Sequence, residues 1–231
     1  DLLERMENAA AALRQDAAPM PDKLHFGAFS ALSTEVTALL RRFCRDFPQI
    51  SVTLDWFEFG TLVPTLAQGK LDGAFTVSFE LLDQPRLASQ KLEDGALFVL
   101  VGKQSPLAGR GSVRLADLAG ATYYTMRPDV SPNGYASILN YFLEHHFRPT
   151  ETRRLSSHES VLLQLQIDPN GYGLMSDFQF RQHPGVVFLP LEPEEQPSSH
   201  LFDLVAAWDR QLVTPALSRF LSWLSQSVPP A

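Results

Sequence analysis

The chain has 231 residues, of which 45% are apolar and 19% charged, and its formal net charge at pH 7 is −7. This length is enough for one large domain or two smaller lobes with a full hydrophobic core. The acidic balance leaves no basic stripe to neutralise several phosphates, which argues against direct DNA binding, and the longest apolar run, Ala96–Val101, is too short to cross a bilayer.

The single cysteine, Cys44, excludes an internal disulfide, and no paired-cysteine metal motif is present. We therefore expect a cytoplasmic protein with no metal and no cofactor. The chain begins with Asp1 and shows no basic leader followed by a short apolar stretch, so we expect that a further segment preceded it.

The first half of the chain predicts alternating strands and helices. Residues 1–17 form an alanine-rich helical pattern that is either a frayed terminal helix or a linker or dimerisation helix. After it come a strand over 23–29, a helix over 32–47, a strand over 50–56, a helix capped by Thr61 and closed by Gly69, and a strand over 71–77. Strands separated by helices in this way imply a parallel sheet with right-handed crossovers.

The second half predicts the same alternation again. Its elements are a strand over 96–102, a short helix over 115–118, a strand over 121–126, a helix around 138–143, a strand over 152–155, a helix opened by a capping box at 156–159, and strands over 171–175, 186–191 and 201–208. A final amphipathic helix starts at Thr214–Pro215. Together these elements predict two α/β units in series, followed by a C-terminal helix that could return to the first unit.

Short motifs in a fixed order then point to a family. They are Leu24–Ala28 in the first strand, Phe47–Pro48 after the long helix, Leu66–Asp72 in the pattern L-x-x-G-x-L-D, and Ser105–Ala108 followed by Leu115–Leu118. With these motifs, the chain from Lys23 onward resembles the effector-binding region of LysR-type transcriptional regulators. It departs from the family at Ser105, where histidine is common, and at 167–171, where a small-residue turn is usual beside the expected cleft.

The resemblance implies an α/β fold of two Rossmann-like lobes, the type 2 periplasmic-binding-protein fold, with a cleft between them. Residues 21–101 and 208–231 would form lobe I, 102–207 lobe II, and 1–20 a remnant of the linker helix. A winged helix-turn-helix would precede Asp1 and make all contacts with DNA. The family also implies a homodimer or homotetramer, with the helix 32–47 of one subunit beside the helix 135–147 of another.

In this fold the cleft would lie at the carboxyl ends of the strands, where helix N-termini point free N–H groups, so we expect a small anionic effector. The candidate ligand-binding residues are Ser30, Thr61, Thr125, Arg127, Ser157, His158, Ser176 and Phe178. Ser30 and Thr61 match family positions that contact the effector. The alternative for the serines and threonines at helix starts is a cap that serves only its own helix, for Arg127 a surface arginine, and for Phe178 core packing.

The sequence predicts no catalysis. It contains neither a G-x-S-x-G nucleophile elbow nor a phosphate-binding P-loop, and Gly171–Gly173 is only the start of a dinucleotide fingerprint. We therefore expect a small-molecule sensor that passes its signal to the DNA-binding head and is not an enzyme. The alternative is a solute-binding protein of a membrane transporter, which shares the fold.

Overall fold

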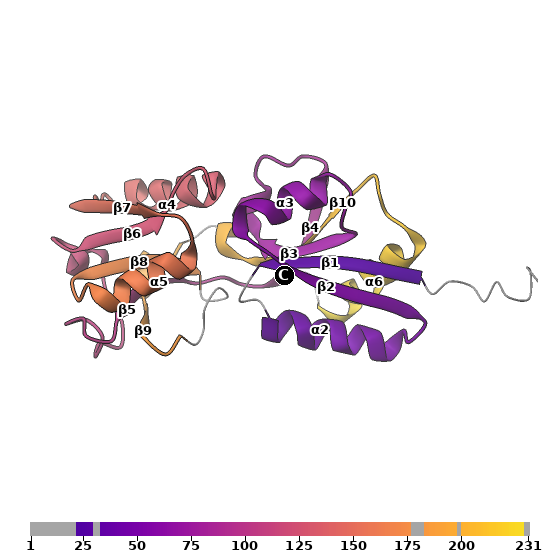
Figure 1. Ribbon diagram of the computed structural model, residues 1–231, viewed down its shortest axis with the longest axis horizontal. Coiled ribbons are helices and arrows are strands. Elements are labelled where there is room, and N and C mark those ends of the chain that lie inside the picture. Colours follow the sequence, from indigo (N-terminus) through magenta and orange to yellow (C-terminus); the bar gives the residue numbers. More distant parts are fainter. Residues whose placement is uncertain (1–21, 30–32, 177–182, 198–199, 229–231) are drawn as a thin grey trace, which may run out of the picture.

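The computed structural model describes residues 22–29, 33–176, 183–197 and 200–228, which form two lobes, each built on one five-stranded mixed sheet (Figure 1). The predicted N-terminal helix over 1–17 lies outside the described residues. Within the described part, no helix is both long and apolar enough to cross a membrane.

Lobe I has the strand order β2-β1-β3-β10-β4. Its strands are β1 (Asp22–Phe29), β2 (Ile50–Phe57), β3 (Gly73–Val77), β4 (Leu87–Glu93) and β10 (Leu204–Asp209). The strands β1, β2 and β3 run parallel, whereas β10 runs antiparallel to both β3 and β4. The helices are α2 (Ser33–Asp46), α3 (Phe59–Ala67) and α6 (Pro215–Ser227).

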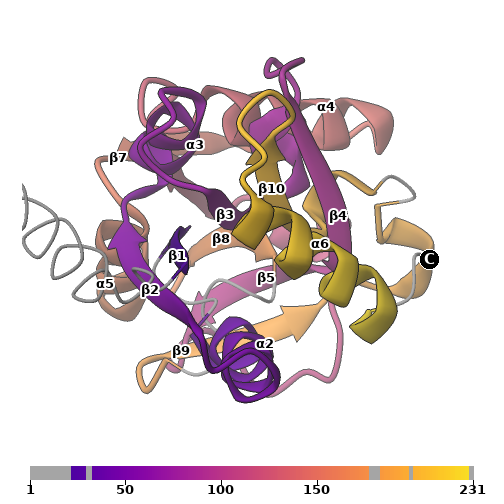
Figure 2. The same cartoon turned by 90° about the vertical axis from the view of Figure 1, so that its right-hand side faces the viewer.

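Successive residues of β1 show how these helices cover both faces of the sheet. The ring of Phe26 packs against Phe220 of α6, and Phe220 in turn meets Phe43 of α2 edge to face. The next residue, Gly27, faces Leu62 of α3 on the other side. Figure 2 shows this arrangement, with α2 and α6 on one side of the strands and α3 on the other. The core of lobe I is therefore aromatic on the face shared by α2 and α6.

Lobe II has the strand order β7-β6-β8-β5-β9. Its elements are β5 (Leu97–Gly102), η2 (Leu115–Leu118), β6 (Thr122–Met126), α4 (Pro132–Glu144), β7 (Glu151–Leu155), α5 (His158–Ile167), β8 (Gly171–Ser176), β9 (Val186–Pro190) and η4 (Pro193–Glu195). Here β6 pairs in parallel with β7 and β8, and β5 is antiparallel to β8 and β9. On the α4 face, Tyr123 stacks on Tyr172 and meets Phe142 edge to face.

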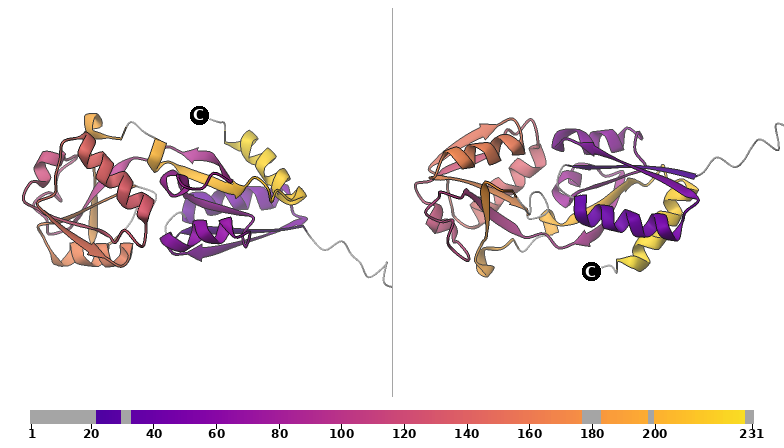
Figure 3. Two further views of the ribbon diagram at one scale, coloured as in Figure 1. Left: turned by 90° about the horizontal axis from the view of Figure 1, so that it is seen from above. Right: turned by 60° about the horizontal axis from the view of Figure 1, so that its bottom comes forward.

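Two segments carry the chain between the lobes, as the views in Figure 3 show. One leads from β4 to β5, and the other returns from β9 to β10 through η5 (His200–Phe202). They touch at Gly95, where any Cβ atom would overlap the carbonyl oxygen of Phe202. We propose lobe boundaries at these two crossings. They place β5 in lobe II and all of β10 in lobe I, in contrast to the expected boundaries after residues 101 and 207.

Two local expectations need correction, and one strand was not predicted. The N-cap of α3 is Glu58, not Thr61, because the helix starts at Phe59. The cap of α5 is Ser157, whose hydroxyl accepts a hydrogen bond from the Ser160 amide, so the expected capping box is displaced by one residue. The strand β4 was not predicted, because its sequence lacks an apolar run. In contrast, Thr214 caps α6 as expected, accepting from the Leu217 amide at 3.2 Å.

Candidate functional site

The carboxyl ends of parallel strands from both lobes face one another. Two adjoining cavities lie there, and both are lined by Met126 and His158. The first cavity is lined by Phe79, Thr125, Met126, Ser131, Gly134, Tyr135, Ile138, His158, Leu174, Met175, Ser176 and Phe202. The second is lined by Phe29, Trp56, Phe57, Glu58, Met126, Val130, Ser156, Ser157, His158 and Glu159. Since residues of both lobes line each cavity, the site is an interlobe cleft.

The first cavity is small in this arrangement of the lobes. Its volume is about 40 Å³, whereas a protein cavity that binds benzene has a volume of about 150 Å³. A ring-sized molecule therefore enters only after the lobes separate or the lining rearranges.

Ser176, the last residue of β8, supplies an unusual polar group in the first cavity. Its side chain is 2% exposed, and its Oγ atom has no hydrogen-bond partner among the described residues. Leaving a buried hydroxyl unpaired costs about 1–3 kcal/mol of folding free energy. A ligand that bonds to Ser176 would recover that free energy. Thr125, at the end of the neighbouring strand β6, lines the same cavity.

His158 begins α5 and lies between the two cavities. Burial lowers the pKa of its imidazole to about 4, because burial disfavours the charged form. The ring is therefore neutral at pH 7 and presents a hydrogen-bonding group rather than a cation to the cavities. The Ser157 hydroxyl beside it is committed to its own helix through the Ser160 amide.

The structure brings four of the eight predicted site residues to the cleft: Thr125, His158 and Ser176 at the first cavity, and Ser157 and His158 at the second. Thr61 lines neither cavity. Its exposed hydroxyl donates a hydrogen bond to the Glu58 carbonyl at 2.8 Å. Arg127 also lines neither cavity, and its Nε donates to the Asp129 carboxylate at 3.1 Å. Ser30 and Phe178 lie outside the described residues.

Sequence reasoning missed several residues of the first cavity. Ser131 precedes Pro132, and a serine before a proline is a helix-start signal that could have identified it. Phe79 and Phe202 belong to η1 (Ser78–Leu81) and η5, next to the crossing segments. No local pattern identifies them, because only the tertiary fold brings these short helices to the cleft.

The departure from the family pattern at 167–171 lies away from the cleft. Asp168 accepts a hydrogen bond from the Tyr124 hydroxyl at 2.9 Å, and Asn170 donates to the Gly120 carbonyl at 3.3 Å. The strand β8 starts only at Gly171, and its far end at Ser176 reaches the cleft. Five residue steps of about 3.3 Å separate those ends, so this turn does not shape the cleft directly.

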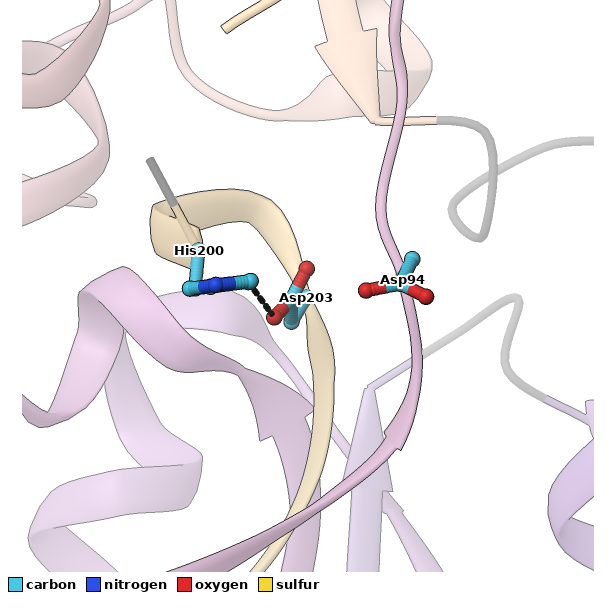
Figure 4. A group of neighbouring side chains, drawn as sticks. All are labelled: Asp94, His200 and Asp203. Atoms are coloured by element: carbon cyan, nitrogen blue, oxygen red, sulfur yellow. Dashed lines mark hydrogen bonds and ion pairs between the residues drawn. The ribbon is translucent and has the colours of Figure 1, made fainter. Parts of the chain in front are cut away.

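A second polar cluster lies where the crossing segments meet (Figure 4). It consists of Asp94, His200 and Asp203, whose possible ligand atoms lie within 4.8 Å of one another. Asp203 is already engaged, since it accepts from the Gly95 amide at 3.0 Å and pairs with His200 Nδ1 at 3.0 Å. The Lys91 ammonium binds Asp94 at 2.6 Å and lies 4.0 Å from Asp203. The Lys91 ammonium thus provides the positive charge beside the two carboxylates. The cluster connects the two crossing segments, since Asp94 lies on one and His200 and Asp203 lie on the other.

Comparisons with known proteins agree with this architecture. The model of the LysR substrate-binding domain family matches residues 19–229. The effector-binding domain of QuiR in complex with shikimate is 18% identical, with 89% of this chain and 96% of that chain covered and a TM-score of 0.73. The regulatory domain of CcmR from Synechocystis PCC6803 in complex with 2-PG is 16% identical, with coverage of 90% and 98% and a TM-score of 0.69.

A longer relative, the LysR family transcriptional regulator CbnR, is 16% identical, with 98% of this chain and 77% of that chain covered and a TM-score of 0.71. No curated protein matches the chain in sequence. The structural likenesses confirm the predicted fold, two α/β lobes of the type 2 periplasmic-binding-protein kind. The family match confirms a non-enzymatic regulatory domain and does not favour the transporter alternative. The chain therefore belongs to the LysR substrate-binding domain family.

Proposed function

We propose that this domain binds a small-molecule effector in the interlobe cleft and signals its presence to a winged helix-turn-helix that precedes Asp1. The observation that carries the proposal is the buried Ser176 hydroxyl, which has no hydrogen-bond partner among the described residues and lies in a cavity that both lobes line. Thr125, Ser157 and His158 are further polar residues in the lining of the two cavities. No bond of the effector is made or broken.

The lining indicates how an anionic effector would be held. None of the described residues that line the two cavities is a lysine or an arginine. The N-termini of α4 and α5 reach the cleft at Gly134 and His158, and the first amides of a helix have no partner within the helix. We therefore propose a small anion with one charged group, bound by amides and hydroxyls, with an apolar body against the cavity wall. Shikimate and 2-PG, bound by the relatives QuiR and CcmR, are the first compounds to test.

Thermodynamic linkage explains how binding of the effector would change regulation. An effector shifts regulation only as far as it binds one arrangement of the lobes and subunits more tightly than another. We propose a cytoplasmic homodimer or homotetramer in which α2 of one subunit lies beside α4 of another. The exposed apolar side chains Leu139 and Leu143 on α4 support this pairing, since they are 46% and 63% exposed in the single chain.

A thermal-shift screen tests the binding site. A ligand that binds only the folded state raises the melting temperature by mass action. We expect shikimate, 2-PG or another small anion to raise it in the wild-type chain, and the Ser176→Ala and Thr125→Val variants to lose that shift. Ser222→Ala, on the exposed face of α6, is the matched control and should keep it. A shift that survives both cleft substitutions would contradict the proposed site.

A further inference from the structure

Beside the first cavity, one hydrogen bond joins the two lobes directly. The Ser131 hydroxyl of lobe II donates to Oε1 of Glu80 in η1 of lobe I at 2.6 Å. Both side chains are buried, with 8% of Glu80 and 1% of Ser131 exposed. Ser131 occupies the N-cap position of α4, yet its side chain makes no cap bond to its own helix. The hydroxyl is therefore used across the cleft instead of within α4.

We propose that the Glu80–Ser131 hydrogen bond is a proton-dependent latch: the lobes close most tightly when Glu80 is protonated, and loss of that proton favours the open arrangement. The physical reason is desolvation. In the closed arrangement α4 packs against η1 and covers the carboxyl group, whereas separation of the lobes would return it to water. This inference concerns the lobes themselves and holds whether or not an effector is bound.

Among the residues that the structure describes, the surroundings of Glu80 provide no compensating cation. The elements packed most extensively against η1 are β3, α4 and η5. β3 has no titratable side chain, and the first turn of α4 has no acidic or basic residue, although Tyr135 follows it. In and after η5, His200 and Asp203 are paired with each other at 3.0 Å. Among these described groups, the hydrogen bond from Ser131 and the partial positive charge at the N-terminus of α4 are the two influences that favour an ionised Glu80.

Burial raises the pKa of Glu80 from its ordinary 4.5 to about 7, and the hydrogen bond from Ser131 opposes this rise. An open cleft would restore the ordinary value. Between those two values the closed arrangement binds a proton that the open one has released, so closure weakens as the pH rises. His158 has the opposite linkage, because burial lowers its pKa to about 4. A variant that changes Glu80 alone is therefore needed to separate the two.

Single-molecule fluorescence energy transfer can measure closure without an effector. Dyes at Lys70→Cys in lobe I and Glu144→Cys in lobe II, both exposed positions, would report the lobe separation in a Cys44→Ala background. Glu80→Gln keeps an oxygen that accepts from Ser131 but cannot ionise. We expect the closed-to-open ratio of the labelled chain, relative to its Glu80→Gln variant, to fall about tenfold between pH 6 and pH 8.

Two further variants complete the test. Asp83→Asn removes an acidic charge from an exposed position three residues from Glu80, and it should follow the unmodified labelled chain at every pH. Ser131→Ala removes the donor and should open the lobes at both pH values. Should Glu80→Gln fold poorly, Glu80→Met provides the same comparison. Parallel pH profiles with and without Glu80 would overturn the latch, and this result would leave the proposed effector site untouched, since that site is tested by binding.

Discussion

Gly60 of lobe I and Val130 of lobe II lie so close across the cleft that a Cβ atom on Gly60 would overlap the Val130 carbonyl oxygen. Gly60 lies in the first turn of α3, and Val130 precedes α4. The absence of a side chain at position 60 therefore allows the backbones of the two lobes to meet at the edge of the second cavity.

Gly60→Ala should force the lobes apart while both cores remain intact. Because a backbone oxygen cannot move aside as a flexible side chain can, we expect the closed-to-open ratio to fall about fivefold or more, in the range typical of coupling between two arrangements. Small-angle scattering should show a larger radius of gyration than in the wild-type chain. Gly111→Ala, where a Cβ would meet nothing within 4 Å, is the control. Unchanged dimensions would show that the lobes can adjust to the extra atom.

Gly95→Ala should instead reduce the stability of the whole chain. A Cβ atom at Gly95 would overlap the Phe202 carbonyl, and shifting that segment would strain the bond from the Gly95 amide to Asp203. Overpacking of this kind costs about 1–3 kcal/mol, so we expect a loss of about 2 kcal/mol or more in the free energy of unfolding, measured with urea. Gly111→Ala should lie within about 0.5 kcal/mol of wild type. Equal midpoints for the two variants would contradict a tight crossing.

Two serines at the cleft should respond to alanine in opposite directions. Ser176→Ala removes a buried hydroxyl that has no partner in the described part of the chain, so the ligand-free chain should become more stable by about 1 kcal/mol. Ser157→Ala removes the cap of α5 and should lower the stability by about 1 kcal/mol. Urea unfolding without ligand measures both. A loss of stability in Ser176→Ala would mean that its hydroxyl has a partner in solution, which would weaken its assignment to the effector.

The sequence predicted most elements because their apolar spacing is periodic, as in β2, where Ile50, Val52 and Leu54 alternate with polar residues. The sequence did not predict elements whose secondary structure depends on tertiary contacts. Residues 87–93 become β4 only because β10, more than a hundred residues later, pairs with them. For the site, Ser176 could be identified because it ends a buried strand. Glu80 could not, because its partner Ser131 lies in the other lobe.

His158 should make the free energy of unfolding of the chain decrease as the pH falls below neutral. Its folded pKa, about 4, lies below its ordinary 6.5 because burial disfavours the imidazolium. The neutral ring's contribution is therefore fully present above about pH 6.5 and is lost as the pH falls towards 4. The difference of about 2.5 units limits this contribution to roughly 3 kcal/mol, at about 1.4 kcal/mol per unit.

We expect His158→Asn to lose less free energy of unfolding than wild type between pH 7 and pH 5, measured by urea titration at each pH. His146→Asn is the matched control, because His146 is exposed and its positive φ of 50° suits asparagine. It should follow the wild-type pH profile. If His158→Asn follows that profile as well, the imidazole is reached by water in solution, and the cleft is open at that point in the free protein. The comparison of the wild-type and His158→Asn profiles therefore distinguishes two states of His158. In one the imidazole is buried and neutral, and in the other it is exposed and gains a proton as the pH falls.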